Sequence, residues 1–546
     1  MAIYCNQVGY LPQAKKVATM TAGKQYKVVR TDGSRHEVVL EAAGEERGYD
    51  ATAGDNVVRA DFSQITELGS YHLENELGEV SHTFTISDKV YRPLQRDLLK
   101  ALYYQRCGCP LEEKYAGIYE HPCCHTGEAM LWEDHSVIRE VKGGWHDAGD
   151  FGRYISSAAV AVAHLLYAFE LFGDSFGEEI NIPESGNGVP DVLNECRYEL
   201  EWMLKMQDEE GGAYHKLTSE RHADFIMPQE DKAQFYLFPV SSMATADYAA
   251  VMALASRVYK AYDEAFAGKM WEAAVSAYGW LEKHPEYRGF HNPETCNTGE
   301  YDDDCDLDER LWAAAEMLVT TGQQKYQDMV TKLLQENLTL TEFGWGDVSG
   351  LASMAILTDK GHKADIATVT RIHDAVRKEA DRLVKLAKET GYGVAMEAED
   401  YLWGSNMIVL NRGMLLLLEA FLIKQSEEPD KEKLAAAYEE TALAQLHYLL
   451  GNNAVDYSYV TGYGEHAYQN PHNRPTACDG IKLPMPGWVS GGPFKTPCDE
   501  VGEKEIPKGT PPMKCYLDRV ECYSLNEITI YWNSPAVFVT AYFNRR

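Results

Sequence analysis

The spacing of apolar residues changes near residue 88, and this change constrains the fold more than any other feature of the sequence. Before it, short segments alternate apolar and polar residues, as in residues 16–20, 26–30, 37–40 and 82–86. An alternation with period two is typical of β-strands. About seven such strands, separated by Gly, Asp and Asn, predict a small all-β sandwich over residues 1–88.

Beyond residue 88, long stretches rich in Ala and Leu predict helices through most of residues 89–546. We expect helices over residues 156–172, 190–206, 243–266, 307–321, 363–390, 406–424 and 431–450. Several of them carry few charges on one side, which is typical of helices buried between neighbours. The sequence therefore predicts an all-α domain, but a count of about a dozen helices fits a barrel, a bundle or a solenoid equally well.

Composition excludes several classes of partner. The 546 residues are 45% apolar, which is enough to bury the cores of two or more domains. The chain has 51 basic and 84 acidic residues, giving a formal charge of −33. This charge repels phosphate backbones and anionic lipids, so we expect no nucleic-acid or membrane partner. By inspection, no apolar run approaches the roughly 20 residues that span a bilayer.

The first residues and the cysteines bear on the cellular compartment. Residues 1–5 have neither the basic start nor the apolar core of a signal peptide. Twelve cysteines in so long a chain predict thiols and metal ligands rather than a disulfide scaffold, which favours a reducing compartment. A cytoplasmic protein and a secreted one whose signal has been removed both fit, and the cysteines favour the first.

Two separated segments hold acids suited to catalysis. In residues 143–152, Asp147 and Asp150 lie three residues apart among glycines and aromatic residues. One such carboxylate can take a proton while the other orients a water molecule, although an Asp-rich turn bonded to its own backbone has the same sequence. Glu527 is the only acid in an apolar run that reaches Phe543. Apolar surroundings would raise its pKa and make it a proton donor, unless it only caps a helix start.

These segments belong to a series of motifs along nearly the whole chain. They are Asn-Gln-Val-Gly-Tyr at residues 6–10, Gly-Trp-His-Asp-Ala-Gly-Asp at 144–150, Tyr-Leu-Trp-Gly-Ser-Asn at 401–406, Ser-Tyr-Val-Thr-Gly-Tyr-Gly at 458–464, Pro-His-Asn-Arg-Pro at 471–475, and Asn-Glu at 526–527 with Asp518 and Tyr523 before it. In these motifs the sequence resembles glycoside hydrolase family nine, the inverting β-1,4-glucanases. The resemblance implies an immunoglobulin-like β-sandwich over residues 1–88, followed by an (α/α)6-barrel catalytic domain over 89–546 with its active site on loops at one end.

The resemblance also implies roles for individual residues. Asp150 would be the general base, Asp147 its partner in holding the water, and Glu527 the general acid. His472 and Arg474 would contact sugar hydroxyls, although Asn473 stands between them where the family commonly has a second His. Trp403 and Tyr463 are candidate platforms for sugar rings, with buried packing as the alternative for each.

Two clusters of candidate metal ligands accompany these residues. Soft ligands within 40 residues suit tetrahedral zinc, and the resemblance implies a structural zinc on Cys107, Cys124, His125 and His146. Cys109 and Cys123 are alternative thiols. The acidic run at residues 301–309 suits calcium or, alternatively, a solvated acidic helix start. The resemblance implies calcium just before this helix, with Asp308 and Glu309 matching the family's Asp-Glu pair. The residues before that pair depart from the family's usual pattern, and Asp304 and Asp306 are the further candidate ligands.

The sequence therefore predicts an inverting endo-β-1,4-glucanase acting, as a monomer, on cellulose-like or mixed-linkage β-glucan. The runner-up is an exo-acting glycosidase on cello- or chito-oligosaccharides, that is, an exo-glucosidase or exo-glucosaminidase. A non-catalytic glycan-binding protein is less favoured, because it has no need of both Asp150 and Glu527. A zinc peptidase is disfavoured because the sequence has no His-Glu-x-x-His motif.

Overall fold

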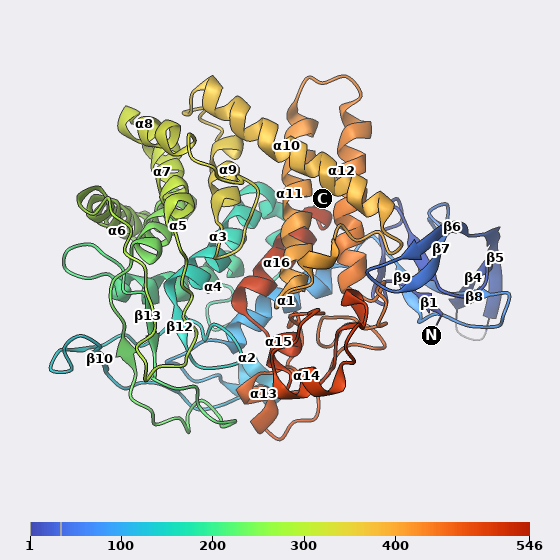
Figure 1. The fold of residues 1–546 in the computed structure, drawn as a ribbon, viewed down its shortest axis with the longest axis horizontal. Helices are drawn as coiled ribbons and strands as arrows, with labels where there is room; N and C mark the ends of the chain where they lie inside the picture. The colour runs from blue at the N-terminus through green and yellow to red at the C-terminus, as the bar shows by residue number, and fades with distance from the viewer. Residues whose placement is uncertain (1, 33–34, 546) are drawn as a thin grey trace.

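The chain folds into a β-sandwich followed by a larger helical domain, as the computed structural model of residues 2–32 and 35–545 shows (Figure 1). The sandwich has nine short strands: β1 Ile3–Tyr4, β2 Gly9–Tyr10, β3 Val17–Met20, β4 Gln25–Asp32, β5 Arg35–Ala43, β6 Glu45–Asp50, β7 Asp55–Asp61, β8 Gly69–Asn75 and β9 Phe84–Ile86. The four strand segments expected from the sequence correspond to β3, β4, β5 and β9, so alternation alone located them.

The strands form two packed sheets with one apolar core. One sheet has the order β1-β3-β7-β6 and the other β2-β9-β8-β4-β5, with β2 and β9 as the parallel pair. Inward-facing side chains such as Tyr10, Met20, Val28 and Phe84 are buried between the sheets. Burial of alternate residues is the reason that the period-two pattern is visible in the sequence.

Helices make up most of the second domain. They are α1 Arg92–Tyr104, α2 Glu113–Ala116, α3 Ile155–Phe172, α4 Asp191–Met203, α5 Ser242–Tyr259, α6 Glu264–Lys283, α7 Leu307–Thr321, α8 Gln324–Leu333, α9 Ser349–Thr358, α10 Ile366–Glu389, α11 Ser405–Gln425, α12 Lys431–Leu449, α13 Arg474–Cys478, α14 Glu500–Glu505, α15 Tyr523–Asn526 and α16 Ile530–Phe543. The seven stretches predicted as helical lie on α3, α4, α5, α7, α10, α11 and α12.

One predicted helix is wrong in its length. The stretch over residues 243–266 crosses a helix boundary, because α5 ends at Tyr259 and α6 begins at Glu264. The break is built by Asp263, whose side chain accepts a hydrogen bond from the backbone N–H of Phe266 and so caps α6. The aromatic and alanine residues on both sides hid this boundary.

The helices form a closed double ring. α3, α5, α7, α9, α11 and α16 contact one another in that order, and α16 returns to α3. Each has an outer neighbour, respectively α4, α6, α8, α10, α12 and α1. The inner helices are buried on nearly all sides, whereas α10 buries only a stripe at Ile372, Val376, Ala380 and Leu383. This arrangement is an (α/α)6 barrel.

Two inner helices correct the reading of the sequence as free of long apolar segments. Ile155–Phe176 and Ser405–Gln425 are long and apolar enough to cross a membrane by length and composition, with a mean hydropathy of 1.6 each. In the structure, 83% and 72% of their apolar windows are buried inside the protein. Their apolar character is that of barrel core helices.

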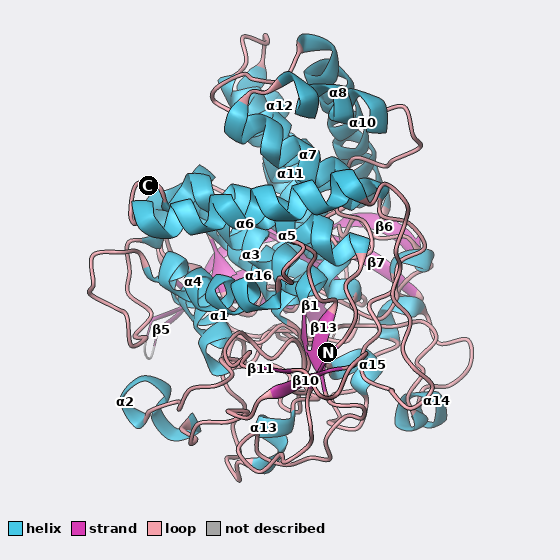
Figure 2. Ribbon diagram, turned by 90° about the vertical axis from the view of Figure 1, so that its left-hand side faces the viewer, coloured by secondary structure: helices cyan, strands magenta, loops and turns pink. Residues whose placement is uncertain are grey.

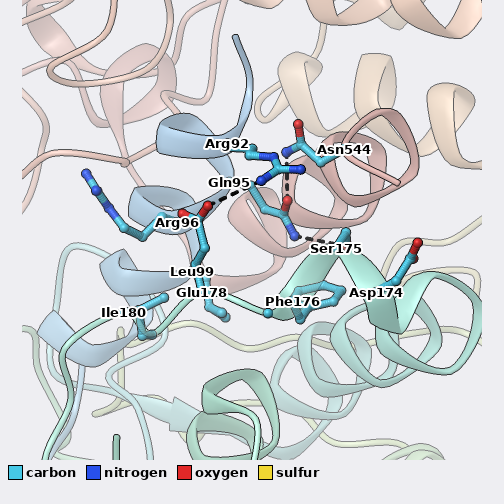
Figure 3. A pocket seen from close by; sticks show the side chains of 11 residues that line it. Arg92, Gln95, Arg96, Leu99, Asp174, Ser175, Phe176, Glu178, Ile180 and Asn544 are labelled. Carbon is cyan, nitrogen blue, oxygen red and sulfur yellow. Dashed lines mark hydrogen bonds and ion pairs between the residues drawn. The ribbon is translucent and has the colours of Figure 1, made fainter. Parts of the chain in front are cut away.

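Side chains of the first helix of the barrel, α1, contact the ends of α3 and of the last helix, α16. Gln95 of α1 donates a hydrogen bond to the Ser175 hydroxyl and accepts one from Asn544, which follows α16. Figure 3 shows these side chains around a small pocket of about 40 Å³. The contacts join the two ends of the helical domain.

Loops gather at one end of the barrel, together with a small sheet that the sequence did not predict (Figure 2). This sheet has the order β11-β10-β14-β13-β12, with β10 at Ala129–Leu131, β11 at Ile138–Arg139, β12 at Arg153–Tyr154, β13 at Lys216–Thr218 and β14 at Tyr236–Leu237. Its pairing fixes loops from distant parts of the chain next to one another. The predicted catalytic residues lie on these loops and on the loop that precedes α16, and the predicted sugar platform Trp403 lies just before α11.

Candidate active site

A cleft of about 380 Å³ brings the three predicted catalytic acids together. Asp147, Asp150 and Glu527 all line it, although Glu527 lies 377 residues beyond Asp150. The first two precede β12, and Glu527 lies in the short turn between α15 and α16. The barrel thus brings both ends of the helical domain to one site, as the motifs implied.

Asp150 lies among cationic groups. Its Oδ2 accepts a hydrogen bond from His222 Nδ1 at 3.0 Å and another from the Gly152 N–H at 3.3 Å. Burial acts to raise the pKa of Asp150, but His222 and the Arg474 guanidinium outweigh burial and hold this pKa well below its usual range. The carboxylate of Asp150 is therefore kept ionised.

Asp147 is buried next to it and has a different environment. Its Oδ2 accepts a hydrogen bond from the Tyr301 hydroxyl at 2.5 Å, while its buried Oδ1 has no partner among the described protein groups. Burial raises the pKa of Asp147 to about 7, with the Asp150 charge adding to the rise and the hydroxyls of Ser157 and Tyr301 opposing it. Asp147 Oδ1 therefore has acceptor capacity for a water molecule beside Asp150.

Glu527 has the properties of a proton donor. Burial raises its pKa well above the usual range, and the negative charges of Asp150 and Asp147 raise it further, against a smaller opposing effect of Arg474. Its backbone forms a bridge with His472, and the His472 N–H donates to the Asn526 carbonyl at 2.9 Å. The helix-start alternative therefore does not account for its position in the cleft.

His472 and Arg474 connect the segment of Glu527 to the loop that carries Asp147 and Asp150. The Arg474 backbone N–H and its guanidinium both donate to the Gly149 carbonyl, at 3.0 and 2.9 Å. A Cβ on Gly149 would lie 1.8 Å from the His472 carbonyl oxygen, so only glycine permits this approach. His472 Nδ1 donates to the Val520 carbonyl at 2.6 Å, which leaves Nε2 for another partner.

Of the two predicted sugar platforms, only Trp403 lines the cleft. Its side chain is 44% exposed and its ring lies 5.3 Å from that of Tyr523. Tyr463 does not line the cleft, because its hydroxyl is bound to Pro93 and to Asp97 of α1, each at 2.6 Å. The buried-packing alternative therefore describes Tyr463. Further aromatic residues that were not predicted as site residues also line the cleft: Tyr154, Trp345, Tyr531 and Trp532.

Sequence reasoning also missed His222 and Tyr301, the side chains that contact the two aspartates. His222 lies on a loop after β13 and belongs to no recognised motif. Tyr301 begins the acidic run at residues 301–309, which suggested a calcium site or a solvated helix start but no contact with Asp147. Its φ of 50° is unusual for a tyrosine and marks a constrained residue, but such strain is visible only in the structure.

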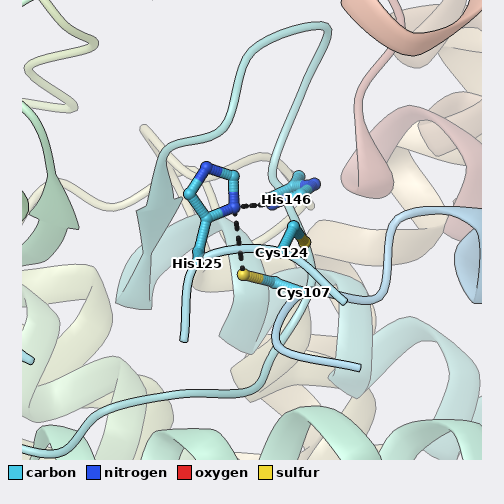
Figure 4. Close-up of side chains that lie close together, drawn as sticks. All are labelled: Cys107, Cys124, His125 and His146. Carbon is cyan, nitrogen blue, oxygen red and sulfur yellow. Dashed lines mark hydrogen bonds between the residues drawn. The ribbon is translucent and has the colours of Figure 1, made fainter. Parts of the chain in front are cut away.

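The predicted zinc ligands converge beside the loop that carries Asp147 and Asp150 (Figure 4). One ligand atom each from Cys107, Cys124, His125 and His146 lies within 4.8 Å of the others. His125 Nδ1 is 3.7 Å from the Cys107 sulfur and 3.2 Å from His146 Nε2. The other nitrogen of His125 faces Asp231 Oδ2 at 3.3 Å, as carboxylates commonly support metal-bound histidines. This soft donor set fits tetrahedral zinc, and Cys109 and Cys123 are not part of it.

The predicted calcium ligands converge only in part. Asp308 and Glu309 are grouped with Asp303, whereas Asp304 and Asp306 lie outside this group. Asp306 instead pairs with Arg310 at 2.8 Å. Both carboxylate oxygens of buried Glu309 lack partners among the described residues, as do those of buried Asp247. Because buried carboxylates without partners are costly, this oxygen-rich set fits a calcium ion.

Comparison with known proteins places the chain in a family. The model of glycosyl hydrolase family 9 matches residues 91–540, and that of the cellulase N-terminal Ig-like domain matches residues 1–78. The chain belongs to glycosyl hydrolase family 9. It is therefore a glycoside hydrolase, and the predicted Ig-like sandwich and (α/α)6 barrel are confirmed.

Relatives cover the whole chain. A cellodextrinase of Butyrivibrio fibrisolvens is 41% identical, with 98% of both chains covered. A xyloglucan-specific endo-β-1,4-glucanase of Bacteroides ovatus is 34% identical over 98% of this chain and 92% of its own. Among solved structures, a thermostable endoglucanase from Alicyclobacillus acidocaldarius superposes with a TM-score of 0.91 at 33% identity, covering 100% of each chain. This family 9 hydrolase therefore shares both domains with its relatives.

Proposed function

We propose that this family 9 hydrolase is an endo-β-1,4-glucanase that cleaves cellulose-like or mixed-linkage β-glucan with inversion. The observation that carries the proposal is the opposite electrostatic environment of two carboxyl groups in one cleft. Both carboxyl groups are shielded from bulk water, but Asp150 lies beside His222 and Arg474, which lower its pKa, whereas the pKa of Glu527 is raised. A pair with separated pKa values provides the base and the acid that single displacement requires.

In the proposed mechanism, Asp150 accepts a proton from a water molecule that Asp147 holds through its free Oδ1. The water oxygen attacks the anomeric carbon as the glycosidic C–O bond breaks through an oxocarbenium-like transition state. Glu527 donates its proton to the departing sugar oxygen. The new hydroxyl lies on the face opposite the departing group, so the anomeric configuration is inverted.

Substrate binding would use the aromatic walls of the cleft. Trp403, Trp345 and Trp532 can pack on the apolar faces of glucose rings. His472 Nε2 has no hydrogen bond within the described protein, so it can serve a sugar hydroxyl. The neutral sugar would be held by packing and hydrogen bonds, with little contribution from the net charge of −33.

Product analysis tests this function. The full-length enzyme would be incubated with carboxymethylcellulose, barley β-glucan, cellopentaose and chitopentaose. Viscosity and the distribution of oligomers would be followed over time, and NMR would record the anomeric form of the new end. We expect rapid viscosity loss, mixed cello-oligomers and an α-configured new end. Release of the β-anomer would reject the roles of Asp150 and Glu527.

A second candidate is an exo-acting enzyme on short cello-oligosaccharides. The observation that favours it is the 41% identity to a protein named cellodextrinase over 98% of both chains. Glucose or cellobiose released from cellopentaose, without viscosity loss on the polymers, would establish this candidate. Turnover of chitopentaose alone would instead establish the glucosaminidase variant.

We also propose a domain boundary at residue 88 and a structural zinc on Cys107, Cys124, His125 and His146. β9 ends at Ile86 and α1 begins at Arg92, which supports the boundary.

Four protein ligands would complete the zinc coordination, so the ion would anchor the loop that carries Asp147 rather than bind water. Removal of zinc by a chelator is expected to lower Tm. An unchanged Tm with zinc verified absent would exclude a structural role.

Calcium is proposed on Asp303, Asp308 and Glu309, with Asp247 facing them. Asp308 Oδ2 also accepts the Val348 N–H at 2.8 Å, so the ion would connect the loop of Tyr301 to the segment that follows Trp345. We expect calcium depletion to lower kcat and Tm together, with recovery on re-addition. Full activity in a calcium-free preparation would exclude this site.

A further inference from the structure

A cluster of histidines and carboxylates lies at the junction of the two domains, remote in sequence from the catalytic motifs. His82 belongs to the sandwich, between β8 and β9, while Asp456, Glu465 and His466 belong to the loops that follow α12. One ligand atom each from His82, Asp456 and His466 lies within 4.8 Å of the others. His82 Nε2 is 3.0 Å and His466 Nδ1 is 3.9 Å from Asp456 Oδ2. Three metal-ligating groups from two domains therefore converge.

The second nitrogen of His82 is also held. His82 Nδ1 lies 2.9 Å from Glu465 Oε2. A proton on Nδ1 donated to Glu465 leaves the lone pair of Nε2 directed toward Asp456. A carboxylate behind a histidine is the usual support of a metal-bound imidazole, since it fixes both the tautomer and the ring orientation.

The contacts of Asp456 fix its carboxylate at the junction. The side chain is 14% exposed, and its buried Oδ1 has no hydrogen-bond partner among the described groups. The Asp456 carbonyl oxygen accepts a hydrogen bond from Gln7 Nε2 at 2.8 Å and lies 2.9 Å from His466 Nδ1, which donates to it only in the tautomer that carries the proton there. His466 can bind an ion through Nδ1 in the other tautomer, with its proton on Nε2. A buried carboxylate oxygen without a partner is costly unless a cation or another donor satisfies it.

We propose that this junction binds a divalent metal ion of the zinc class through His82, Asp456 and His466, with Glu465 as the outer carboxylate. Two imidazoles and one carboxylate are the donors that zinc prefers, whereas calcium prefers oxygen ligands throughout. The two carboxylates balance the charge of a divalent ion. His466 is 44% exposed, so solvent can supply a fourth ligand. The bound ion would cross-link the Ig-like domain to the barrel.

The same contacts could arise without a metal, with a protonated His82 held between two carboxylates. Removing one imidazole distinguishes a metal site from a protonated His82, because only a metal site loses zinc. Other contacts also join the two domains. Gln7 N donates to the Leu450 carbonyl at 2.9 Å, and Arg59 Nε donates to the Gly391 carbonyl at 2.9 Å. Variants at the cluster are therefore expected to fold.

The experiment compares zinc content of the full-length protein and three variants. Each protein is stripped with a chelator, equilibrated with zinc in a metal buffer that fixes the free concentration, and supplied with excess calcium to fill oxygen-ligand sites. His82→Gln and His466→Gln each remove one proposed ligand. His362→Asn removes an exposed imidazole elsewhere and serves as the matched control. Metal is counted by mass spectrometry, and Tm is recorded with and without zinc.

We expect both cluster variants to bind about one zinc per chain less than the parent and His362→Asn, as loss of a ligand from a three-ligand site predicts. The zinc-dependent rise in Tm should shrink in the same two variants. Zinc on the cysteine-containing cluster remains in all four proteins and provides an internal reference. Equal zinc content in all four would overturn the proposal and leave a protonated His82. If His82→Gln fails to fold, the exposed position of His466 keeps the test decisive.

Discussion

The two sides of the cleft contain similar carboxylic acids in opposite surroundings. On the base side, Asp150 accepts hydrogen bonds from His222 and from the Gly152 N–H, with Arg474 nearby. On the other side, Glu527 lines the cleft together with Trp403, Tyr531 and Trp532. In the proposed mechanism, surroundings rather than residue type would assign the roles of base and acid.

The two sides are also coupled. The negative charges of Asp150 and Asp147 add to the rise in the pKa of Glu527, so ionisation on the base side helps to keep the acid protonated. Arg474 lies between them and favours the ionised form of both. The separation between the pKa values of Asp150 and Glu527 therefore depends partly on the charge of Asp150 itself.

The largest effect is expected from Asp150→Asn, which removes the base without changing the size of the side chain. We expect kcat to fall by about 10²–10⁴-fold, the usual contribution of general acid–base catalysis. The loss should be as large on 2,4-dinitrophenyl β-cellobioside as on cellopentaose, because water activation is needed for both. Asp224→Asn is the matched control, since no hydrogen bond joins it to the cleft residues. A loss confined to cellopentaose would contradict the role of Asp150.

Glu527→Gln should separate the acid side from the base side. We expect a similar fall of about 10²–10⁴-fold on cellopentaose, but a much smaller one on 2,4-dinitrophenyl β-cellobioside, whose leaving group needs no proton. Glu521→Gln changes an exposed glutamate of the same segment and should retain full activity. Equal losses on the two substrates would show that Glu527 is not the proton donor.

The sequence was sufficient for features that depend on local pattern. Strand alternation located β3, β4, β5 and β9, and apolar periodicity located the buried helices. The acids at positions 147, 150 and 527 stand in motifs whose spacing along the chain can be recognised. Composition alone indicated a soft-ligand set but left Cys109 and Cys123 as alternatives, and the family resemblance selected the four residues that converge in the structure.

Features that depend on long-range contacts could not be read from the sequence. His222 approaches Asp150 only because the loop after β13 folds over the base loop. Asp303 joins Asp308 and Glu309, whereas Asp306 pairs with Arg310. Tyr463 carries the same aromatic signal as Trp403 but bonds to α1. Sequence spacing does not distinguish these outcomes.

A moderate effect is expected from Tyr301→Phe, which removes the hydroxyl bound to Asp147. A hydrogen bond to a charged group is worth about 1.5–3 kcal/mol, so we expect kcat to fall by about tenfold or more. The pKa of Asp147, about 7 in the parent, should rise because the hydrogen bond that lowers it is lost. Tyr119→Phe removes a hydroxyl that donates to the Pro484 carbonyl and does not line the cleft, so it is the matched control. Equal kcat values for the two variants would show that the hydroxyl of Tyr301 does not position the water.

The smallest effect at the optimum, and the most specific test of the comparison, is expected from His222→Gln. The variant removes the charge that lowers the pKa of Asp150, so this pKa should rise toward its usual range. Because the base must be ionised, the acidic limb of the kcat/KM profile then moves to higher pH. The alkaline limb, which reports Glu527, should move little, and kcat on the plateau should stay within about threefold. His362→Gln changes an exposed histidine that does not line the cleft and is the control. A shift of the alkaline limb alone would mean that His222 acts on the acid side, and the cationic surroundings of Asp150 would no longer explain its role.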